Sequence, residues 1–325
     1  MPSSSALGAT EDRPTGHGPD IGLALQPLHL AQLICEADPA RGMTVVARNA
    51  ARWAPLLACR PDLLLVPVED RAAVLASAQA RRDPFTTVHA VPWNRTALRL
   101  ERAALRAGGR VTLIEDGVGC YRKPQPMTLK QRLRQLAYRV VDGTRYAEHV
   151  AGRTGERNVR LVSLVPDQAA ARPRPQALDV EPFRALLPQL AAPFADFARW
   201  RGHPVFFDTN DVDSGWLSLA DKVALLRELL PAGPLVYFRH PFQTTSLVGH
   251  IEGLVDLTDE ARGWNEMATF VIAPERIVSA FSSAAITLRH LFGLPVAHTT
   301  LHEAFLARTG APGYAIGPDM AALIA

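Results

Sequence analysis

The chain has 325 residues, of which 48% are hydrophobic and 21% charged, and it carries a formal net charge of +3. This length allows two domains with separate cores, and the mild basic excess lacks the concentrated stripe and recognition motif of a nucleic-acid-binding protein. The three cysteines, Cys35, Cys59 and Cys120, show no spacing typical of a disulfide scaffold or a zinc site, so a reducing compartment fits best.

The beginning of the chain, 1–19, is rich in Ser, Gly, Pro and Thr and has no basic segment followed by an apolar core. We interpret it as a disordered leader rather than a signal peptide. The apolar stretch 21–35 is too short to span a membrane and is interrupted by Gln26, Pro27 and Gln32.

Strand-like and helix-like segments alternate after this leader, as expected for a parallel sheet covered by helices on both faces. Strands are expected at 21–25, 44–47, 63–66, 86–90, 110–114 and 159–165. Helices are expected at 28–36, 50–57, 71–81 and 95–107. Together these segments predict one doubly wound α/β domain over residues 20–180.

The strand expected at 110–114 runs directly into Glu115, Asp116 and Gly117. Ligand crevices in open α/β sheets lie outside the carboxyl ends of the strands, and glycine adopts backbone angles that other residues avoid. The favoured interpretation is a functional acidic pair at the edge of the sheet. The alternative is a solvated turn with a helix-capping aspartate, because Asp and Gly are ordinary turn residues.

The segment 122–139 is basic and has no acidic residue. Its basic residues are Arg122, Lys123, Lys130, Arg132, Arg134 and Arg139. Apolar residues recur there at helical spacing, and they are Leu129, Leu133, Leu136 and Val140. A solvated helix face is the commoner explanation for such a charge run. The alternative is peripheral contact with an anionic membrane surface or an acidic acceptor.

A stretch rich in Pro, Ala and Arg at 166–180 predicts a linker, which places the domain boundary near residue 180. Beyond it, strands are expected at 204–207, 235–238, 254–257, 277–281 and 295–298, and helices at 182–201, 217–230 and 284–292. Residues 181–325 therefore predict a second Rossmann-like domain. Small ligands preferentially bind in the cleft between two such domains.

Two strands of this second half lead into polar residues that suit phosphate chemistry. The strand at 235–238 precedes His240, and the strand at 277–281 precedes Ser282 and Ser283 at a helix start. A histidine can donate a proton or a charged hydrogen bond to a leaving phosphate, and hydroxyls with free helix N–H groups can bind an anion. In isolation, paired serines are more often a plain cap and a histidine before proline is more often structural.

The order Glu115-Asp116-Gly117, His240-Pro241 and Ser282-Ser283 resembles the acidic–acidic–Gly, His–Pro and Ser–Ser/Thr motifs of bacterial sialyltransferases, including the lipooligosaccharide and capsule polysialyltransferase families. Gln26-Pro27-Leu28-His29-Leu30 is similar to the segment that starts their N-terminal domain. The resemblance implies a GT-B glycosyltransferase with two Rossmann-like domains facing each other across a cleft. It also implies an inverting reaction with a CMP-activated nonulosonic acid and a glycan or glycolipid acceptor, with no metal or other cofactor.

By motif position, the resemblance implies that Asp116 deprotonates the acceptor hydroxyl, with Glu115 beside it orienting or tuning it. His240 would stabilise and protonate the CMP phosphate as it leaves. The residues placed around the substrates are Gly117, Pro241, Ser282, Ser283, Asp208, Asn210, Glu266, Gln26 and His29. A plain acid at a helix start remains the alternative for Glu266.

Two departures from the family pattern leave the donor sugar open. The loop 208–211 is more acidic than the family's loop, and Val118 stands where Ser or Thr is expected. Pseudaminic acid, legionaminic acid and Kdo are alternative donor sugars, and the acceptor cannot be read from the sequence. A nucleotide-sugar donor and the missing export signal favour the cytoplasm, including the inner face of the plasma membrane.

Three alternatives to the sialyltransferase function remain open. A glycerophosphate or other polymer-building transferase would also use a histidine for a phosphate but would not need the acidic pair. A nucleotide-dependent oxidoreductase is disfavoured, because no GxGxxG follows the first strand. A catalytically inactive binding protein that keeps the fold is compatible with all of these features.

Overall fold

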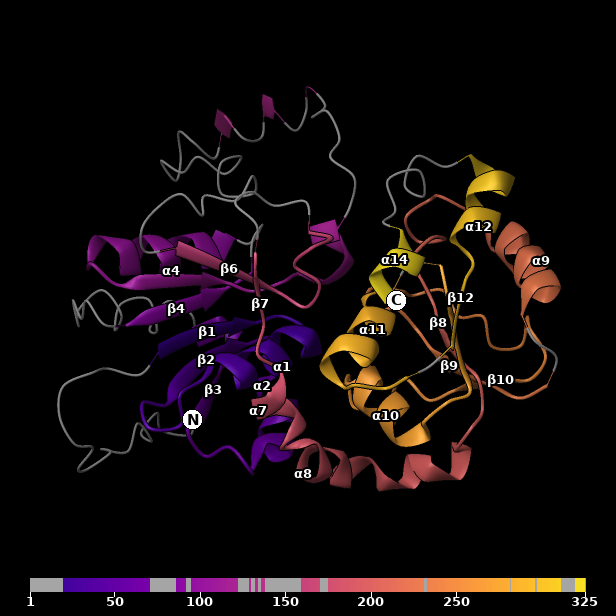
Figure 1. Ribbon diagram of the computed structural model, residues 1–325. Coiled ribbons are helices and arrows are strands. Elements are labelled where there is room, and N and C mark those ends of the chain that lie inside the picture. The colour runs from indigo at the N-terminus through magenta and orange to yellow at the C-terminus, as the bar shows by residue number, and fades with distance from the viewer. Residues whose placement is uncertain are drawn as a thin grey trace, which may run out of the picture.

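The computed structural model describes residues 20–70, 86–91, 95–121, 129, 132–133, 136–137, 159–169, 175–230, 233–280, 282–295, 297–310 and 319–324. Within these ranges the chain forms two parallel sheets that lie side by side, the first in indigo to magenta and the second in orange to yellow (Figure 1). The expectation of two Rossmann-like α/β units is confirmed.

The first sheet contains β1 (Asp20–Ala24), β2 (Met43–Ala47), β3 (Leu63–Pro67), β4 (Thr87–Ala90), β5 (Arg110–Leu113), β6 (Val159–Ser163) and β7 (Gln176–Ala177). Its strands are all parallel and follow the order β3-β2-β1-β4-β5-β6-β7. Its helices are α1 (Pro27–Glu36), α2 (Ala50–Trp53) and α4 (Arg95–Arg106), with 3-10 turns at Ala54–Leu57, Val68–Asp70 and Gly117–Tyr121. The strands expected here are present with slightly shifted ends, whereas the helix expected at 71–81 lies outside the described residues.

Helix α1 packs closely on strand β1. A β-carbon added to Gly22 would lie 2.7 Å from Leu33 Cδ1 and 2.9 Å from Met43 Sδ, so a larger residue here would make the ends of these two side chains move. Pro27 occupies the first turn of α1, where its missing N–H costs no hydrogen bond. A small residue at position 22 and a proline at the helix start therefore suit the close approach of α1 to β1.

The second sheet contains β8 (Val205–Phe207), β9 (Leu235–Phe238), β10 (Leu254–Asp256), β11 (Arg276–Ser279) and β12 (Ala297–Thr300) in the order β10-β9-β8-β11-β12. Its helices are α9 (Leu219–Leu229), α10 (Asn265–Ile272), α11 (Ser283–Ile286), α12 (His302–Thr309) and α14 (Met320–Ile324), and α11 continues into a π-helix at Thr287–Leu291. Helices α12 and α14 and the short strand β7 were not expected from the sequence, and α10 was expected only through the helix-start alternative for Glu266.

The single helix expected at 182–201 is instead three short ones: α7 (Glu181–Arg184), α8 (Leu187–Ala191) and a 3-10 helix (Ala192–Trp200). Each begins with a proline in its first turn, because proline cannot continue the preceding helix but fits a helix start. These helices lead from one domain to the other (Figure 1). Phe183 of α7 is buried and its ring packs against Phe292 at a centroid distance of 5.1 Å, which anchors the link to the second domain.

Residues that follow strands of one sheet contact residues that follow strands of the other. Gly117, after β5, lies against Ser283, after β11. The guanidinium of Arg48, after β2, lies 5.6 Å from the ring centroid of Phe242, after β9. The carboxyl edges of the two sheets therefore face each other. None of the described helices combines the length and apolar character needed to cross a membrane.

Candidate functional site

Asp116 lies three residues beyond the end of β5, and its side chain is 37% exposed. Its Oδ1 accepts hydrogen bonds from His29 Nε2 at 2.9 Å and from Gln26 Nε2 at 3.2 Å. Both donors belong to the β1–α1 segment, so the structure brings together two motifs that are almost ninety residues apart in the sequence. The result is a partly exposed carboxylate with a fixed orientation.

His29 is 1% exposed, and its hydrogen bonds with Leu25 and Asp116 favour one tautomer, although Gln26 Nε2 also lies 2.9 Å from His29 Nε2. Nδ1 accepts the backbone N–H of Leu25 at 3.2 Å, so in the neutral ring the proton sits on Nε2 and points at Asp116. The resemblance placed Gln26 and His29 at the substrate. In the structure, His29 lies behind Asp116 and orients it, and Gln26 shares that contact.

Glu115 points into the protein and is 1% exposed. Its Oε2 accepts hydrogen bonds from Tyr121 Oη at 2.6 Å, the Leu164 N–H at 2.8 Å and Ser163 Oγ at 3.1 Å. Burial raises the pKa of Glu115 from 4.5 to about 7, although the hydrogen bond from Tyr121 and the two others oppose the rise. Its backbone N–H and C=O both bond the Gln32 side chain at 2.9 Å.

The Glu115 carboxylate is nevertheless close enough to Asp116 to interact with it, because burial raises the pKa of Glu115 and the charge of Asp116 adds to that rise. Glu115 is 1% exposed whereas the Asp116 side chain is 37% exposed, so the two carboxylates lie in different surroundings. Glu115 anchors the strand end from which Asp116 projects, and its expected role in orienting or tuning Asp116 stays a prediction.

Gly117 joins the acidic motif to the serine motif. Its φ of +67° confirms the expected need for glycine, and an added β-carbon would lie 2.8 Å from Ser283 Cβ and 3.1 Å from Ser283 Oγ. Ser282 caps α11, because its Oγ accepts the Ala284 N–H at 3.2 Å. The structure thus brings these two motifs into direct contact, with Ser283 nearest to Gly117.

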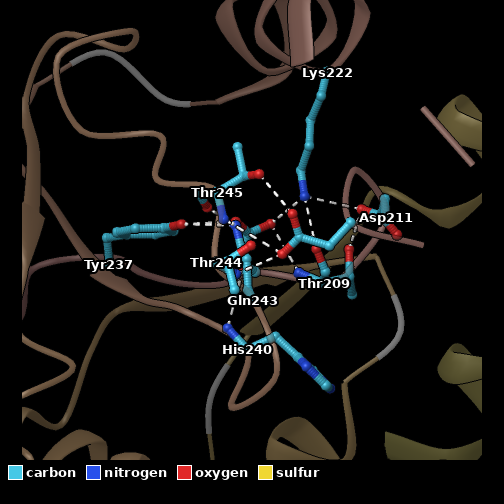
Figure 2. A network of polar contacts seen from close by, with 10 residues as sticks. Thr209, Asp211, Lys222, Tyr237, His240, Gln243, Thr244 and Thr245 are labelled. Atoms are coloured by element: carbon cyan, nitrogen blue, oxygen red, sulfur yellow. Dashed lines mark hydrogen bonds and ion pairs between the residues drawn. The ribbon is translucent and has the colours of Figure 1, made fainter. Parts of the chain in front are cut away.

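His240 follows β9 in a loop that is held by Gln243 (Figure 2). Gln243 Oε1 accepts the His240 N–H at 3.2 Å, and Gln243 Nε2 donates to Asp208 Oδ2 at 2.6 Å. The imidazole points away from this network, and its Nδ1 accepts the Phe242 N–H at 3.3 Å. The neutral ring therefore carries its proton on Nε2, where it can donate to a ligand.

Burial lowers the pKa of His240, and the nearby carboxylates of Asp208 and Asp211 oppose this only in part. The pKa shift favours the neutral ring at neutral pH. In the ligand-free protein the ring is then a hydrogen-bond donor, and an approaching anion would favour its protonation.

A buried lysine explains the acidic loop after β8 (Figure 2). Lys222 Nζ lies 2.6 Å from Asp208 Oδ1, 3.0 Å from Asp211 Oδ2 and 2.7 Å from the Thr209 carbonyl oxygen. The Lys222 and Asp208 side chains are 1% and 0% exposed, so this carboxylate is not available to a nucleotide. The expectation that Asp208 contacts the donor is corrected: it neutralises the core lysine.

Sequence reasoning did not find Lys222 or Gln243. The role of Lys222 could have been predicted, because it lies on the same face of α9 as Leu225 and Leu226, where an apolar residue is expected. A lysine in such a stripe requires a buried anionic partner. Gln243 had no comparable signal.

The remaining expected site residues are Asn210, Pro241 and Glu266. Asn210 is half-buried, and its Oδ1 is buried without a hydrogen-bond partner in the described structure. Pro241 is exposed beside His240. Glu266 lies in the first turn of α10, as the helix-start interpretation expects, but burial raises its pKa, whereas a helix N-terminus favours the charged carboxylate. Among the described residues no group of three or more His, Cys, Asp or Glu side chains could hold a metal ion.

No family model matches the sequence, and no curated protein sequence matches it. The fold is similar to that of an α/β-galactoside α-2,3-sialyltransferase from Photobacterium phosphoreum, with a TM-score of 0.59, 12% identity, and coverage of 87% of this chain and 90% of that one. The protein has a two-domain, Rossmann-like GT-B fold. At 12% identity this similarity defines the fold and not the reaction.

Two other solved structures match with lower scores. A putative UDP-N-acetylglucosamine 2-epimerase from Listeria monocytogenes has a TM-score of 0.44 and 10% identity, over 88% of this chain and 80% of that one. Arabidopsis thaliana UGT89C1 complexed with UDP has a TM-score of 0.43 and 11% identity, over 92% of each chain. At these scores neither adds to the assignment of the GT-B fold.

Proposed function

We propose that the protein is a glycosyltransferase that moves sialic acid, or a related nonulosonic acid, from a CMP donor to a hydroxyl of a surface-glycan acceptor. The reaction inverts the anomeric centre and needs no metal ion. The observation that carries this proposal is the contact between Gly117 and Ser283, which joins the acidic motif of one domain to the serine motif of the other. The GT-B fold supports it as well.

An inverting displacement needs its base and its leaving-group site on opposite sides of the sugar. Asp116 belongs to the first domain, whereas His240 and Ser283 belong to the second. In the proposed reaction the acceptor hydroxyl gives its proton to Asp116, its oxygen bonds the anomeric carbon, and the bond from that carbon to the phosphate oxygen breaks. A base held in place by two hydrogen bonds, as Asp116 is, needs little reorganisation to act.

His240 and the two serines would bind the CMP phosphate as it leaves. The Nε2–H of His240 can donate to a phosphate oxygen, and the growing negative charge favours protonation of the ring. Ser282 and Ser283 supply hydroxyl and backbone donors where β11 passes into α11. Asn210, Pro241 and Glu266 remain proposed contacts of the nucleotide.

CMP release and sugar transfer test the proposal. The purified protein should release CMP from CMP-N-acetylneuraminic acid in the presence of a chelator. Asp116→Asn and His240→Asn should each lower transfer about 100-fold or more, the usual contribution of a general acid or base. Asp196→Asn and His250→Asn are matched controls, because both residues are exposed on the second domain, and they should keep full activity.

The alternatives give different results in the same assays. Turnover of CMP-Kdo or CDP-glycerol, but not of CMP-N-acetylneuraminic acid, would favour another phosphate-leaving-group transferase. Protection from heat by CMP without any turnover would favour an inactive GT-B binding protein. Protection by a nicotinamide cofactor and not by CMP would contradict the transferase proposal.

We also propose that the protein contacts the inner face of the plasma membrane through the segment 122–139. Leu129, Leu133 and Leu136 have helical backbone and are 73%, 58% and 56% exposed. Their spacing puts them on one helix face, and the segment has six basic residues and no acid. This combination matches a surface with anionic lipid headgroups above an apolar interior.

A further inference from the structure

Phe242 is a large apolar side chain that is 62% exposed beside the proposed phosphate site. It follows His240 and Pro241 directly, and its ring lies 5.6 Å from the His240 imidazole, centroid to centroid. The guanidinium carbon of Arg48 lies 5.6 Å from the centroid of the same ring. One aromatic ring thus contacts a proposed reacting group and a cation from the opposite domain.

Arg48 keeps its hydrogen-bonding capacity for a ligand. In the part of the chain that the structure describes, no carboxylate lies within ion-pair distance of Arg48, whereas Arg239 pairs with Asp256 and Asp259. Arg48 is exposed, and its described side-chain partner is the Phe242 ring. A guanidinium that only stacks on a ring retains N–H donors that match the two oxygens of a carboxylate.

We infer that Arg48 and Phe242 form a subsite for a sugar ring that carries a carboxylate. The Arg48 guanidinium pairs with the carboxylate, while the exposed Phe242 ring packs against the C–H face of the sugar. Because the two residues belong to different domains, an occupied subsite also connects the carboxyl edges of both sheets. This inference rests on the proposed function, since it places an acidic sugar beside His240.

A direct binding experiment tests the subsite without requiring turnover. The probes are the α-methyl glycoside of N-acetylneuraminic acid and the carboxyl methyl ester of the same glycoside, titrated into the full chain and followed by NMR. The wild type should bind the acid about 10-fold more tightly than the ester, the gain typical of one charge-assisted hydrogen bond or more. Arg48→Gln should abolish this preference, and Phe242→Ala should weaken binding of both probes.

A matched arginine provides the control. Arg199 is also exposed and stacks on an aromatic ring, that of Trp200, at 6.0 Å, and Arg199→Gln should leave the preference for the acid unchanged. Equal binding of acid and ester by the wild type would overturn the inference. An unchanged preference in Arg48→Gln would overturn it equally.

Kinetics distinguish the two sugars that could carry the carboxylate. If the donor sugar occupies the subsite, Arg48→Gln should raise the KM for CMP-N-acetylneuraminic acid in CMP release without acceptor. If the acceptor occupies it, the variant should raise the KM for a sialylated acceptor and not for its neutral counterpart. A wild type that prefers the acid but never releases CMP would refute the proposed function and leave the subsite intact.

Discussion

Gly117 of the first domain lies so close to Ser283 of the second that a β-carbon on Gly117 would be 2.8 Å from the Ser283 β-carbon. Real β-carbons essentially never approach so closely, so any larger residue at position 117 must push one of the two segments away. The distance between the acidic motif and the serine motif is thus set by the absence of a single side chain.

Replacing Gly117 with alanine should destabilise the protein in two ways. The left-handed backbone, with φ of +67°, costs an alanine about 1 kcal/mol, and the clash with Ser283 adds about 1–3 kcal/mol. Gly215→Ala is the matched control, because φ there is +71° and nothing lies within 4 Å of an added β-carbon. Urea unfolding of both variants should show the larger loss for Gly117→Ala.

The contact itself is tested by a second change. Adding Ser283→Gly to Gly117→Ala removes the clashing side chain and should recover the part of the loss that exceeds Gly215→Ala. Equal destabilisation by Gly117→Ala and Gly215→Ala would show that Ser283 does not restrict the size of the residue at position 117.

The order of the strands, apart from the short β7, was predictable because short β-rich runs alternate with helical periodicity on both sides of residue 180. The placement of Gly117 at a strand end was also predictable, since it follows an apolar run and two acids. The direction of a side chain in a loop was not. The sequence around Asp208 would look the same whether its side chain faced a nucleotide or Lys222, which lies fourteen residues away.

The different roles of the two neighbouring acids were equally unpredictable from the sequence. Glu115 and Asp116 are adjacent, yet Glu115 is buried and bonded to Tyr121, whereas Asp116 is partly exposed and bonded to His29. Only the three-dimensional pairing of β5 with β6 brings Ser163 beside Glu115 and decides which acid is internal. No spacing rule within the sequence contains this information.

Glu115 should make the stability of the protein fall as pH rises. Its pKa is raised from 4.5 in the unfolded chain to about 7 in the folded protein, so between these values only the folded state holds the proton. The free energy of unfolding should therefore decrease from about pH 4.5 to pH 7 and then level off, by about 3 kcal/mol in total.

Glu115→Gln isolates this contribution, because the amide oxygen can still accept from Tyr121, Ser163 and Leu164 but does not titrate. Urea unfolding of the wild type and the variant from pH 4.5 to pH 8 should show the difference in unfolding free energy shifting in favour of the variant. A difference that stays constant over this range would mean that Glu115 does not hold a proton in the folded protein.

Removing the positive charge of Lys222 should destabilise the second domain strongly. Lys222→Met would leave Asp208 and Asp211 buried without a counter-ion, which costs about 3–5 kcal/mol. Arg227→Met lies on the same helix but changes an exposed residue, and it should cost less than about 1 kcal/mol. Urea unfolding measures both.

A partial rescue separates charge from packing in this test. Asp211→Asn neutralises the carboxylate whose Oδ1 is buried without a partner in the described structure, so adding it to Lys222→Met should recover part of the lost stability. If Lys222→Met were as stable as Arg227→Met, the ion pairs with Asp208 and Asp211 would not contribute to the fold.

The exposed leucines should be needed for retention on vesicles. We expect the wild type to bind vesicles that contain phosphatidylglycerol and not vesicles of phosphatidylcholine alone. Changing Leu129, Leu133 and Leu136 together to serine should release the protein, because their exposed side chains are what would enter the lipid. Leu64→Ser is the matched control, since Leu64 is 60% exposed on β3, and it should leave retention unchanged.

The basic residues of the same segment should contribute through charge. Arg132→Gln with Arg134→Gln should weaken binding by about 1 kcal/mol for each arginine, and the difference from the wild type should shrink as salt is added. Cosedimentation with vesicles at low and high salt measures both effects. If retention of the protein on vesicles did not depend on salt and persisted after the leucine changes, 122–139 would be an ordinary solvated helix face. The proposed membrane contact would then be wrong.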